Sequence, residues 1–188
     1  MKRPWSCLST KTVYENKWIR VREDAVIQPN STPGVYGVVE TKAKAVTIVA
    51  FDASMRVCLI NEYQYPLERF VWKLPMGGAG HEHLQPLAAA KQELLEETGL
   101  SADRWHCIGQ IEPIAALCTE VADIYLAFGN LRQTRDPGRP DEPIQDVRFV
   151  SIPELFEMMR TGHMTNGQSL SAILMAAAHL RSELSIDL

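Results

Sequence analysis

The chain has 188 residues, of which 46% are hydrophobic and 22% are charged, as in one globular domain with room for a small additional segment. The formal net charge of −4 argues against a nucleic-acid partner bound through a broad basic surface. No apolar run approaches the roughly 20 residues of a membrane span, and the first residues lack the apolar stretch of a signal peptide. We therefore expect neither a nucleic-acid partner nor a membrane.

The spacing of the cysteines indicates in which cellular compartment the protein is expected. The chain has four cysteines, which are far apart and form no CxxC pair: Cys7, Cys58, Cys107 and Cys118. This spacing is typical of reduced, mostly buried thiols in a cytoplasmic protein and does not favour a zinc site.

Residues 1–42 read as strands outside the main apolar block. In KWIRVREDAVIQP, apolar residues are interleaved with charged ones, as in strands with one solvated face. NSTPG is a turn signal, and VYGVVE follows as a second short strand. We expect these strands to pack on a neighbouring element or on a partner chain.

Strands outnumber helices in the rest of the chain, residues 43–188. AVTIVAF, at 45–51, predicts a buried strand, and the turn DASM followed by RVCLINEYQY predicts a hairpin with it. A short strand is expected at 70–74, and further strands at 105–114, 121–129 and 146–152; helices are expected at 86–98, 153–162 and 166–184. Because the helices do not alternate regularly with strands, the pattern favours an α+β layered domain over a doubly wound sheet.

Three glutamates lie at the C-terminal end of the helix expected at 86–98. Pro86 suits the first turn and Gly99 suits the C-terminal cap. Three- and four-residue spacing places an apolar stripe on one side of this helix, made of Leu87, Ala90, Leu94 and Thr98. The three carboxylates fall mainly on the other side, at Glu93, Glu96 and Glu97.

These carboxylates repel one another, at a cost of about 0.2–0.5 kcal/mol for each like-charge pair three or four residues apart. The negative end of the helix dipole adds a similar small penalty. One interpretation is a solvated acidic surface, which many helices tolerate. The other is a site for Mg²⁺ (or Mn²⁺), since hard oxygen ligands suit these cations and a bound cation turns the repulsion into attraction.

The surrounding motif favours the cation. A glycine-rich loop, LPMGG, precedes the helix, and the helix ends in QELLEETGL. Together they resemble the Nudix box, G-x5-E-x7-R-E-U-x-E-E-x-G-U with U aliphatic, and ELLEETGL matches its last part in full. YENKWIRVREDAV, AVTIVAFD, VCLINEYQYPLERFVWKLPMGG and DVRFVSIPELFEMMRTGHMTNGQSLSAIL also resemble the ADP-ribose pyrophosphatase branch of the Nudix superfamily.

The resemblance implies a fold and an assembly. It implies a Nudix fold, in which a mixed β-sheet lies between helices, with an N-terminal β-strand extension. It also implies a homodimer in which the N-terminal strands of one subunit reach the other. We accordingly divide the chain into residues 1–42, for dimerisation, and residues 43–188, the Nudix hydrolase domain.

Two positions depart from the box pattern. Leu84 stands where the family has glutamate, and Gln92 stands where it has an arginine that is thought to orient the glutamates. Their joint loss removes one charge of each sign, which avoids an unpaired charge near the site. Glu82 is close enough in sequence to replace part of the lost carboxylate. Gly77 and Gly78 compete for the role of the loop glycine.

The expected substrate pocket departs as well. The branch typically has Q-Y-R and W-E-L-P, where this chain has Glu62-Tyr63-Gln64 and Trp72-Lys73-Leu74-Pro75. We expect substrate contacts from Gln64, from Lys73 as a point charge on a phosphate, and from Arg69, for which a solvated loop position is an equal alternative.

The resemblance implies metal-dependent hydrolysis of a nucleoside diphosphate linked to a second group, most readily ADP-ribose or a nucleotide sugar, to a nucleoside monophosphate and a phosphorylated sugar. Glu93, Glu96 and Glu97 would hold Mg²⁺ (or Mn²⁺), with a carbonyl from Met76 or Gly77. The bound cation would lower the pKa of a water molecule. Glu142 is our candidate for the base, ahead of Asp141, Asp146 and Glu120.

The broken box leaves a second function open. A Nudix-fold module could bind a nucleotide without turning it over. Its expected signature is saturable nucleotide binding with no product.

Overall fold

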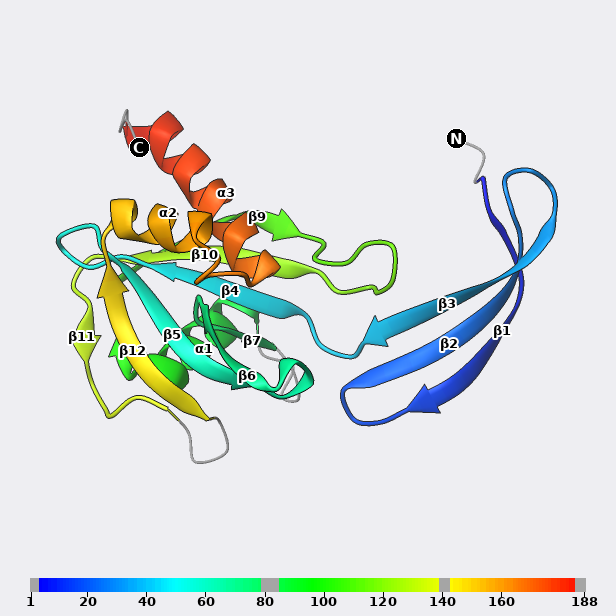
Figure 1. The fold of residues 1–188 in the computed structure, drawn as a ribbon, viewed down its shortest axis with the longest axis horizontal. Coiled ribbons are helices and arrows are strands. Elements are labelled where there is room, and N and C mark those ends of the chain that lie inside the picture. Colours follow the sequence, from blue (N-terminus) through cyan, green and yellow to red (C-terminus); the bar gives the residue numbers. More distant parts are fainter. Residues whose placement is uncertain (1–3, 79–84, 139–142, 185–188) are drawn as a thin grey trace.

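The computed structural model describes residues 4–78, 85–138 and 143–184. These residues form two parts that Figure 1 shows side by side, a separate β-sheet near the N-terminus and a larger body that holds the helices. A short connection between β3 and β4 joins them.

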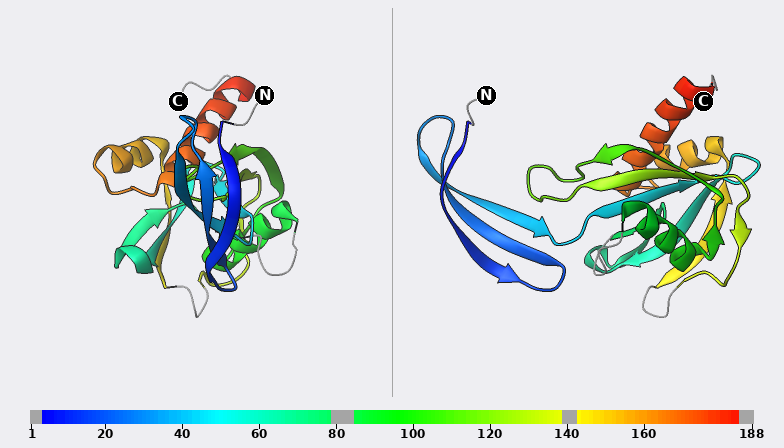
Figure 2. Two further views of the ribbon diagram at one scale, coloured as in Figure 1. Left: turned by 90° about the vertical axis from the view of Figure 1, so that its right-hand side faces the viewer. Right: turned by 180° about the vertical axis from the view of Figure 1, so that it is seen from behind.

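The N-terminal sheet is antiparallel, in the order β1-β2-β3, and its strands are β1 (Ser6–Glu15), β2 (Ile19–Ile27) and β3 (Pro33–Thr41). The strands predicted from KWIRVREDAVIQP and VYGVVE are present. The sequence reading missed β1 because SCLSTKTVYE is mostly polar, and the strand is exposed along its whole length. Figure 2 shows this sheet projecting from the body.

One loop of the body reaches back to this sheet. The amide of Val39 donates to the carbonyl of Leu117 at 2.9 Å, and the amide of Thr119 donates to the carbonyl of Val39 at 2.9 Å. The hydroxyl of Tyr36 donates to the carbonyl of Ala116 at 2.8 Å. Backbone pairing therefore fixes the root of the projecting sheet, while its far end extends beyond the body.

A mixed four-stranded sheet runs through the body in the order β7-β4-β10-β9, with strands β4 (Ala45–Ala50), β7 (Met76–Gly78), β9 (Arg104–Ile111) and β10 (Ala122–Phe128). β4 and β10 are parallel, and the other pairs are antiparallel. Every residue of β4 is buried, as its uninterrupted apolar run predicts. The helices are α1 (Pro86–Thr98), α2 (Ile152–Arg160) and α3 (Gly167–Leu184).

Helices cover both faces of this sheet. Val46 and Ile48 of β4 share one core cluster with Leu94 of α1, while Val49 shares the other with Ile173 of α3. Alternate residues of one strand therefore serve two cores. The predicted α+β class, with a mixed sheet between helices, is confirmed.

A second sheet has the order β12-β5-β6 and is antiparallel, with strands β5 (Val57–Gln64), β6 (Arg69–Lys73) and β12 (Ile144–Val150). The predicted hairpin between β4 and β5 is wrong, because these strands lie in different sheets and share only the bridge between Phe51 and Val57. In the turn, Asp52 Oδ1 accepts from the amides of Ser54 and Arg56 at 2.9 and 2.8 Å. The turn thus moves the chain from one sheet to the next.

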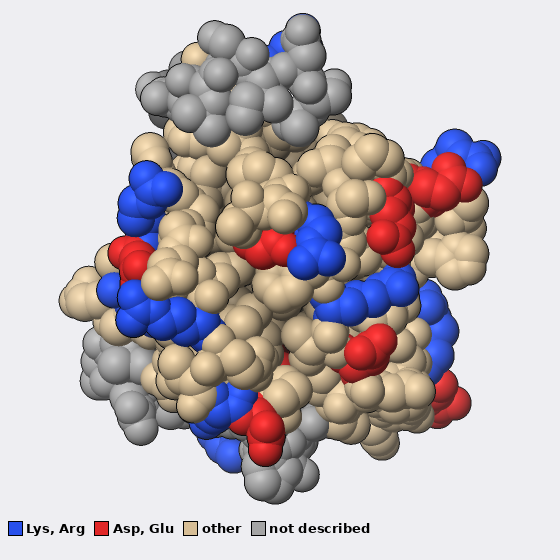
Figure 3. Space-filling model, turned by 90° about the vertical axis from the view of Figure 1, so that its left-hand side faces the viewer, with Lys and Arg blue, Asp and Glu red and all other residues tan. Residues whose placement is uncertain are grey.

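The remaining elements are the 3₁₀ turn η1 (Tyr65–Leu67) and a pair of two-residue strands, β8 (Leu100–Ser101) and β11 (Arg132–Gln133). At the end of the body that lies away from the N-terminal sheet, basic and acidic side chains are interspersed (Figure 3). Within the described ranges, no helix is long and apolar enough to cross a membrane.

Candidate active site

Helix α1 has the predicted bounds, and Ala90, Leu94 and Thr98 of the predicted apolar stripe are buried. Leu87, assigned to the buried stripe, is 38% exposed, whereas Glu97, assigned to the solvated side, is 2% exposed. The buried face thus holds the stripe residues Ala90, Leu94 and Thr98, with Glu97 beside them. The burial of Glu97 was not predicted, because carboxylates are usually surface groups.

The end of α1 is held by the segment that follows β11. Gly99 caps the helix in the left-handed conformation with a φ of 73°, and a Cβ there would overlap the carbonyl of Arg135. The Arg135 guanidinium donates to the carbonyls of Leu95 and Glu96 at 3.0 and 2.9 Å. A cation at the negative end of the helix dipole offsets part of the cost of the three glutamates.

Both carboxylate oxygens of Glu97 have partners. Oε2 accepts from the amide of Met76 at 2.8 Å, and Oε1 lies 3.6 Å from the Nζ of Lys73. Burial raises the pKa of Glu97 to about 8, because the attraction of Lys73 offsets only part of the desolvation. The carboxyl group is therefore fixed in position and has an unusual proton affinity.

Lys73 joins two acidic side chains beneath the site. Its ammonium forms an ion pair with Glu62 as well as with Glu97, and the residue is 6% exposed. Gln64 donates to Glu62 Oε2 at 2.8 Å. Burial lowers the pKa of Lys73, but the attraction of Glu97 and Glu62 outweighs it, so the net shift is upward.

Gly77 and Glu93 are in close contact. A Cβ on Gly77 would overlap the Glu93 carboxylate, so the lack of a side chain at Gly77 leaves room for Glu93 in the position it takes here. The pairing of Gly77 with Val46 on β4 holds the strand in place. Predicted ligands from the loop and from the helix thus meet here, as the box spacing indicates.

Gln92 takes a modest part in this arrangement. Its Nε2 donates to Glu96 Oε1 at 3.1 Å, one turn further along α1. Gln92 is exposed, whereas Glu96 is partly buried. The residue that replaces the family's arginine therefore contacts one glutamate of the box, with a neutral donor.

The remaining predicted residues lie apart from this cluster or outside the described ranges. Arg69 is exposed and donates from Nη2 to Thr165 Oγ1 at 3.2 Å, so its role in substrate binding stays a prediction. Glu142, the predicted base, lies outside the described residues, as do Asp141, Glu82 and Leu84. Of the alternatives for the base, Asp146 is exposed, and burial raises the pKa of Glu120.

The residues of this site fit a hard divalent cation by their chemistry. Three glutamates of α1 supply carboxylate oxygens, and the Glu93 carboxylate lies against the backbone at Gly77. In the described ranges, however, no three acidic, histidine or cysteine side chains already converge as a ready ligand group. Glu97 faces Lys73 and the Met76 amide instead.

The sequence reading missed the role of Glu62, which it treated only as part of an altered substrate motif. The sequence held a signal for this role. Glu62 and Lys73 both differ from the motifs of the branch, they carry opposite charges, and they lie on two strands separated by one short turn. On paired strands, such residues can fall on one face. The register, with Ile60 opposite Lys73 and Glu62 opposite Val71, confirms that arrangement.

Comparison with known proteins identifies the class. The model of the NUDIX domain matches residues 41–171, and a model described as the nucleoside diphosphate sugar hydrolase N-terminal domain matches residues 5–39. The chain therefore belongs to the Nudix family. The prediction of a Nudix pyrophosphohydrolase of the ADP-ribose pyrophosphatase-like branch is confirmed.

Individual relatives cover most of the chain. It is 27% identical over 171 residues to an ADP-ribose pyrophosphatase of Mycobacterium tuberculosis, which covers 89% of this chain and 80% of that protein. It is 23% identical to a CMP-5'-(N-acetyl-N-hydroxy-3-aminopropyl)phosphonate hydrolase of Streptomyces rubellomurinus, over 90% of this chain and 81% of that one. A solved structure of an ADP compounds hydrolase superposes with a TM-score of 0.83 and 19% identity, covering 97% of each chain, which shows the shared fold.

Proposed function

We propose that this protein hydrolyses a nucleoside diphosphate linked to a second group, and that it requires Mg²⁺ or Mn²⁺. The observation that carries the proposal is the buried Glu97 carboxylate, held by Met76 and Lys73 beside the contact of Gly77 with Glu93. A buried, oriented carboxylate next to further acids is the arrangement that metal-assisted phosphate chemistry uses.

ADP-ribose or a nucleotide sugar is the proposed substrate. Relatives named as an ADP-ribose pyrophosphatase and as a hydrolase of a CMP-linked phosphonate support a nucleotide joined to a variable group. The products would be a nucleoside monophosphate and a phosphorylated sugar. Because nucleotides of this kind belong to the interior of the cell, we also propose a cytoplasmic location.

The chain's own residues would perform four tasks. Glu93, Glu96 and Glu97 would hold the cation together with the carbonyl of Gly77. Arg69 and Gln64 would contact the substrate, and Lys73 would add positive charge near its phosphates. The bound cation would neutralise the diphosphate and make a coordinated water more acidic. An acid outside the box, Glu142 in our prediction, would position that water or take its proton.

The first test is a panel of substrates assayed with Mg²⁺ and with Mn²⁺: ADP-ribose, nucleotide sugars, dinucleoside polyphosphates and NADH. The second is Glu97→Gln, which keeps the shape of the side chain but removes its charge. We expect metal-dependent turnover to fall by about 10²- to 10³-fold while the protein stays folded, as when a group that acts directly on transition-state charge is lost. Full activity in that variant would disprove the metal assignment.

One observation favours the alternative of a nucleotide-binding module. The Lys73 ammonium already pairs with Glu97 and so competes with a cation for the same carboxylate. If this competition prevails, the protein will bind ADP-ribose or a nucleotide sugar saturably and release no product at high protein concentration with either metal. Turnover of any member of the panel would exclude this alternative.

We further propose that residues 1–42 join two subunits into a homodimer. The projecting sheet exposes large apolar side chains on a part of the molecule with little core of its own, including Trp5, Tyr14, Trp18 and Val35. Sedimentation should therefore give twice the mass of one chain. A Trp18→Glu variant should shift the equilibrium toward monomer, and a monomeric wild type would refute this assignment.

A further inference from the structure

The position of Glu97 is set by one backbone donor and one cation. The amide of Met76 fixes Oε2 at 2.8 Å, and the ammonium of Lys73 lies 3.6 Å from Oε1. A carboxylate with a hydrogen-bond donor on one oxygen and a cation beside the other cannot rotate about its terminal bond without losing one of these contacts. The two contacts together therefore define its direction.

The cation is itself held rigidly. Lys73 lies on β6, whose pairing with β5 places Lys73 opposite Ile60. Its ammonium forms an ion pair with Glu62, and Gln64 donates to the same carboxylate at 2.8 Å. A buried strand residue with such an anchor keeps one rotamer, which makes it a suitable support for another side chain.

The box position that carries arginine in the family provides no such support here. Gln92 is neutral and exposed, and its side chain donates to Glu96. Arg135 reaches the same end of α1 but bonds the backbone carbonyls of Leu95 and Glu96. In the described part of the chain, Lys73 is the cation seen in an ion pair with the Glu97 carboxylate.

We propose that Lys73 is a positioning residue that orients Glu97, and that in this chain it replaces the arginine for which Gln92 stands. The orienting charge thus comes from the sheet beneath the helix and not from the helix itself. The proposal rests on the proposed function for its catalytic meaning, because orienting Glu97 matters only if Glu97 takes part in the reaction. Its structural content can be tested without any reaction.

The Met76 amide is the reporter. In the metal-free protein, its proton donates to Glu97, so its NMR chemical shift and its hydrogen-exchange protection report whether the carboxylate is in place. Lys73→Met removes the charge and keeps an unbranched side chain of similar length. We expect the Met76 amide resonance to move upfield and its exchange to accelerate by about tenfold or more, as for loss of one hydrogen bond to a charged acceptor.

Lys44→Met is the matched control. Lys44 forms an ion pair with the nearly buried carboxylate of Asp123 at 2.8 Å, so this variant removes a comparable lysine from a different pair. Its Met76 amide should be unchanged. If Lys73→Met does not fold, Glu62→Gln takes its place, because it removes the anchor of Lys73 and should disturb the same resonance. An unchanged Met76 amide in the folded Lys73→Met or Glu62→Gln variant overturns the proposal.

A second-site variant tests the replacement of the arginine. Gln92→Arg in the Lys73→Met background should restore the Met76 resonance at least in part, whereas a merely structural role of Lys73 would not be rescued from the helix. A double variant as disturbed as Lys73→Met overturns this half of the proposal.

Kinetics then connect position to chemistry. Lys73→Met should lower kcat by about 100-fold, the scale of a misplacement of about 1 Å, with KM changed less than about twofold. If kcat/KM fell by the same factor because KM rose while kcat stayed unchanged, the positioning role would be overturned, because that pattern indicates a substrate contact. Absence of turnover in the wild type would refute the proposed function and leave the Met76 result to decide the orientation by itself.

Discussion

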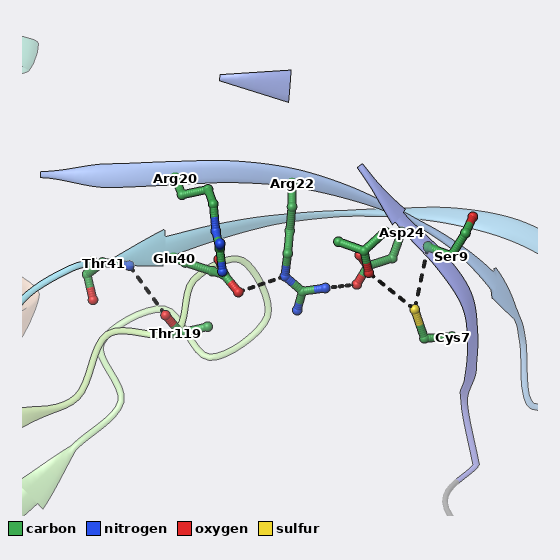
Figure 4. A network of polar contacts seen from close by, with 9 residues as sticks. Cys7, Ser9, Arg20, Arg22, Asp24, Glu40, Thr41 and Thr119 are labelled. Carbon is green, nitrogen blue, oxygen red and sulfur yellow. Dashed lines mark hydrogen bonds and ion pairs between the residues drawn. The ribbon is translucent and has the colours of Figure 1, made fainter. Parts of the chain in front are cut away.

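Among the residues that the structure describes, one network of charged side chains lies in the N-terminal sheet and another lies in the body. In the N-terminal sheet, Arg20 pairs with Glu40, Glu40 with Arg22 at 2.9 Å, and Arg22 with Asp24, as Figure 4 shows. In the body, Glu62 and Glu97 share Lys73. The first network lies on the projecting sheet, where Glu40 and its two arginines are partly exposed although Asp24 is buried, and the second lies under the helix of the Nudix box.

The same pairing chemistry has opposite effects in the two places. Hydrogen bonds from Arg20 lower the pKa of Glu40 and those from Arg22 lower the pKa of Asp24, so both carboxylates are held in the charged form. Burial raises the pKa of Glu97 despite its cation. At the partly exposed Glu40 the partner charge sets the direction of the pKa shift, whereas at the buried Glu97 desolvation sets it.

The largest difference in stability between the two networks should appear when one carboxylate is neutralised in each of them. Glu62→Gln leaves the buried Lys73 ammonium with one of its two carboxylate partners. We expect the free energy of unfolding to fall by about 3 kcal/mol, the lower end of the range for breaking a buried pair. Chemical denaturation in urea measures it. If Glu62→Gln lowered the free energy of unfolding no more than the surface variant Glu40→Gln, the network around Lys73 would have to be well hydrated, and the contrast between the two networks would fail.

The next largest effect is a pH dependence in the metal-free protein. Folding raises the pKa of Glu97 from an ordinary value of 4.5 to about 8, so the folded state binds the proton more tightly. The resulting stabilisation is fully present below about pH 4.5 and is lost as the pH rises through 8. Glu40, whose pKa is lowered, has the opposite sign: its contribution is lost on acidification below its ordinary pKa.

Thermal melting at a series of pH values separates these two contributions. The difference in melting temperature between wild type and Glu97→Gln should decline between about pH 5 and 9, while that between wild type and Glu40→Gln should change only at acidic pH. A difference for Glu97→Gln that is flat across this range would mean that the carboxyl group titrates normally and is not desolvated.

An intermediate effect is expected at Arg135, an exposed side chain that acts on a buried helix end. Arg135→Ala removes two donors to the last turn of α1 and a cation from its negative end. We expect a loss of about 1 kcal/mol in the free energy of unfolding, typical of a helix-terminal cation. Exchange of the amide protons near Glu97 should accelerate locally, and a uniform change across the protein would contradict a role confined to this end.

The sequence predicted the parts that follow from strong local patterns. The apolar run at 45–51 predicted the buried strand, and Pro86 with Gly99 predicted the bounds of α1. The three glutamates of the box were found because their spacing is specific. Each of these features is encoded within a short stretch, so one sequence suffices to read it.

Other features depend on residues that are distant in sequence. The burial of Glu97 requires Lys73 from β6, and the helix end requires Arg135 from the segment after β11. The separation of β4 and β5 into different sheets depends on the strands that each one finds as neighbours. No periodicity in the local sequence reports these contacts, which explains why the burial of Glu97 was not predicted and why the hairpin was predicted wrongly.

The smallest effect should come from Glu40→Gln, which breaks the network of the N-terminal sheet at its central residue. Arg20 and Arg22 stay in contact with water, so they lose an attraction to Glu40 that solvent already weakens. Dissolved salt screens this attraction further, with a Debye length of about 10 Å at 0.1 M. We expect a slight fall in melting temperature at low ionic strength that vanishes in 1 M NaCl, with Glu62→Gln unaffected by salt. If instead the surface variant matched Glu62→Gln at every salt concentration, the sheet would have to be covered in solution, and the partner subunit would be the natural source of that cover.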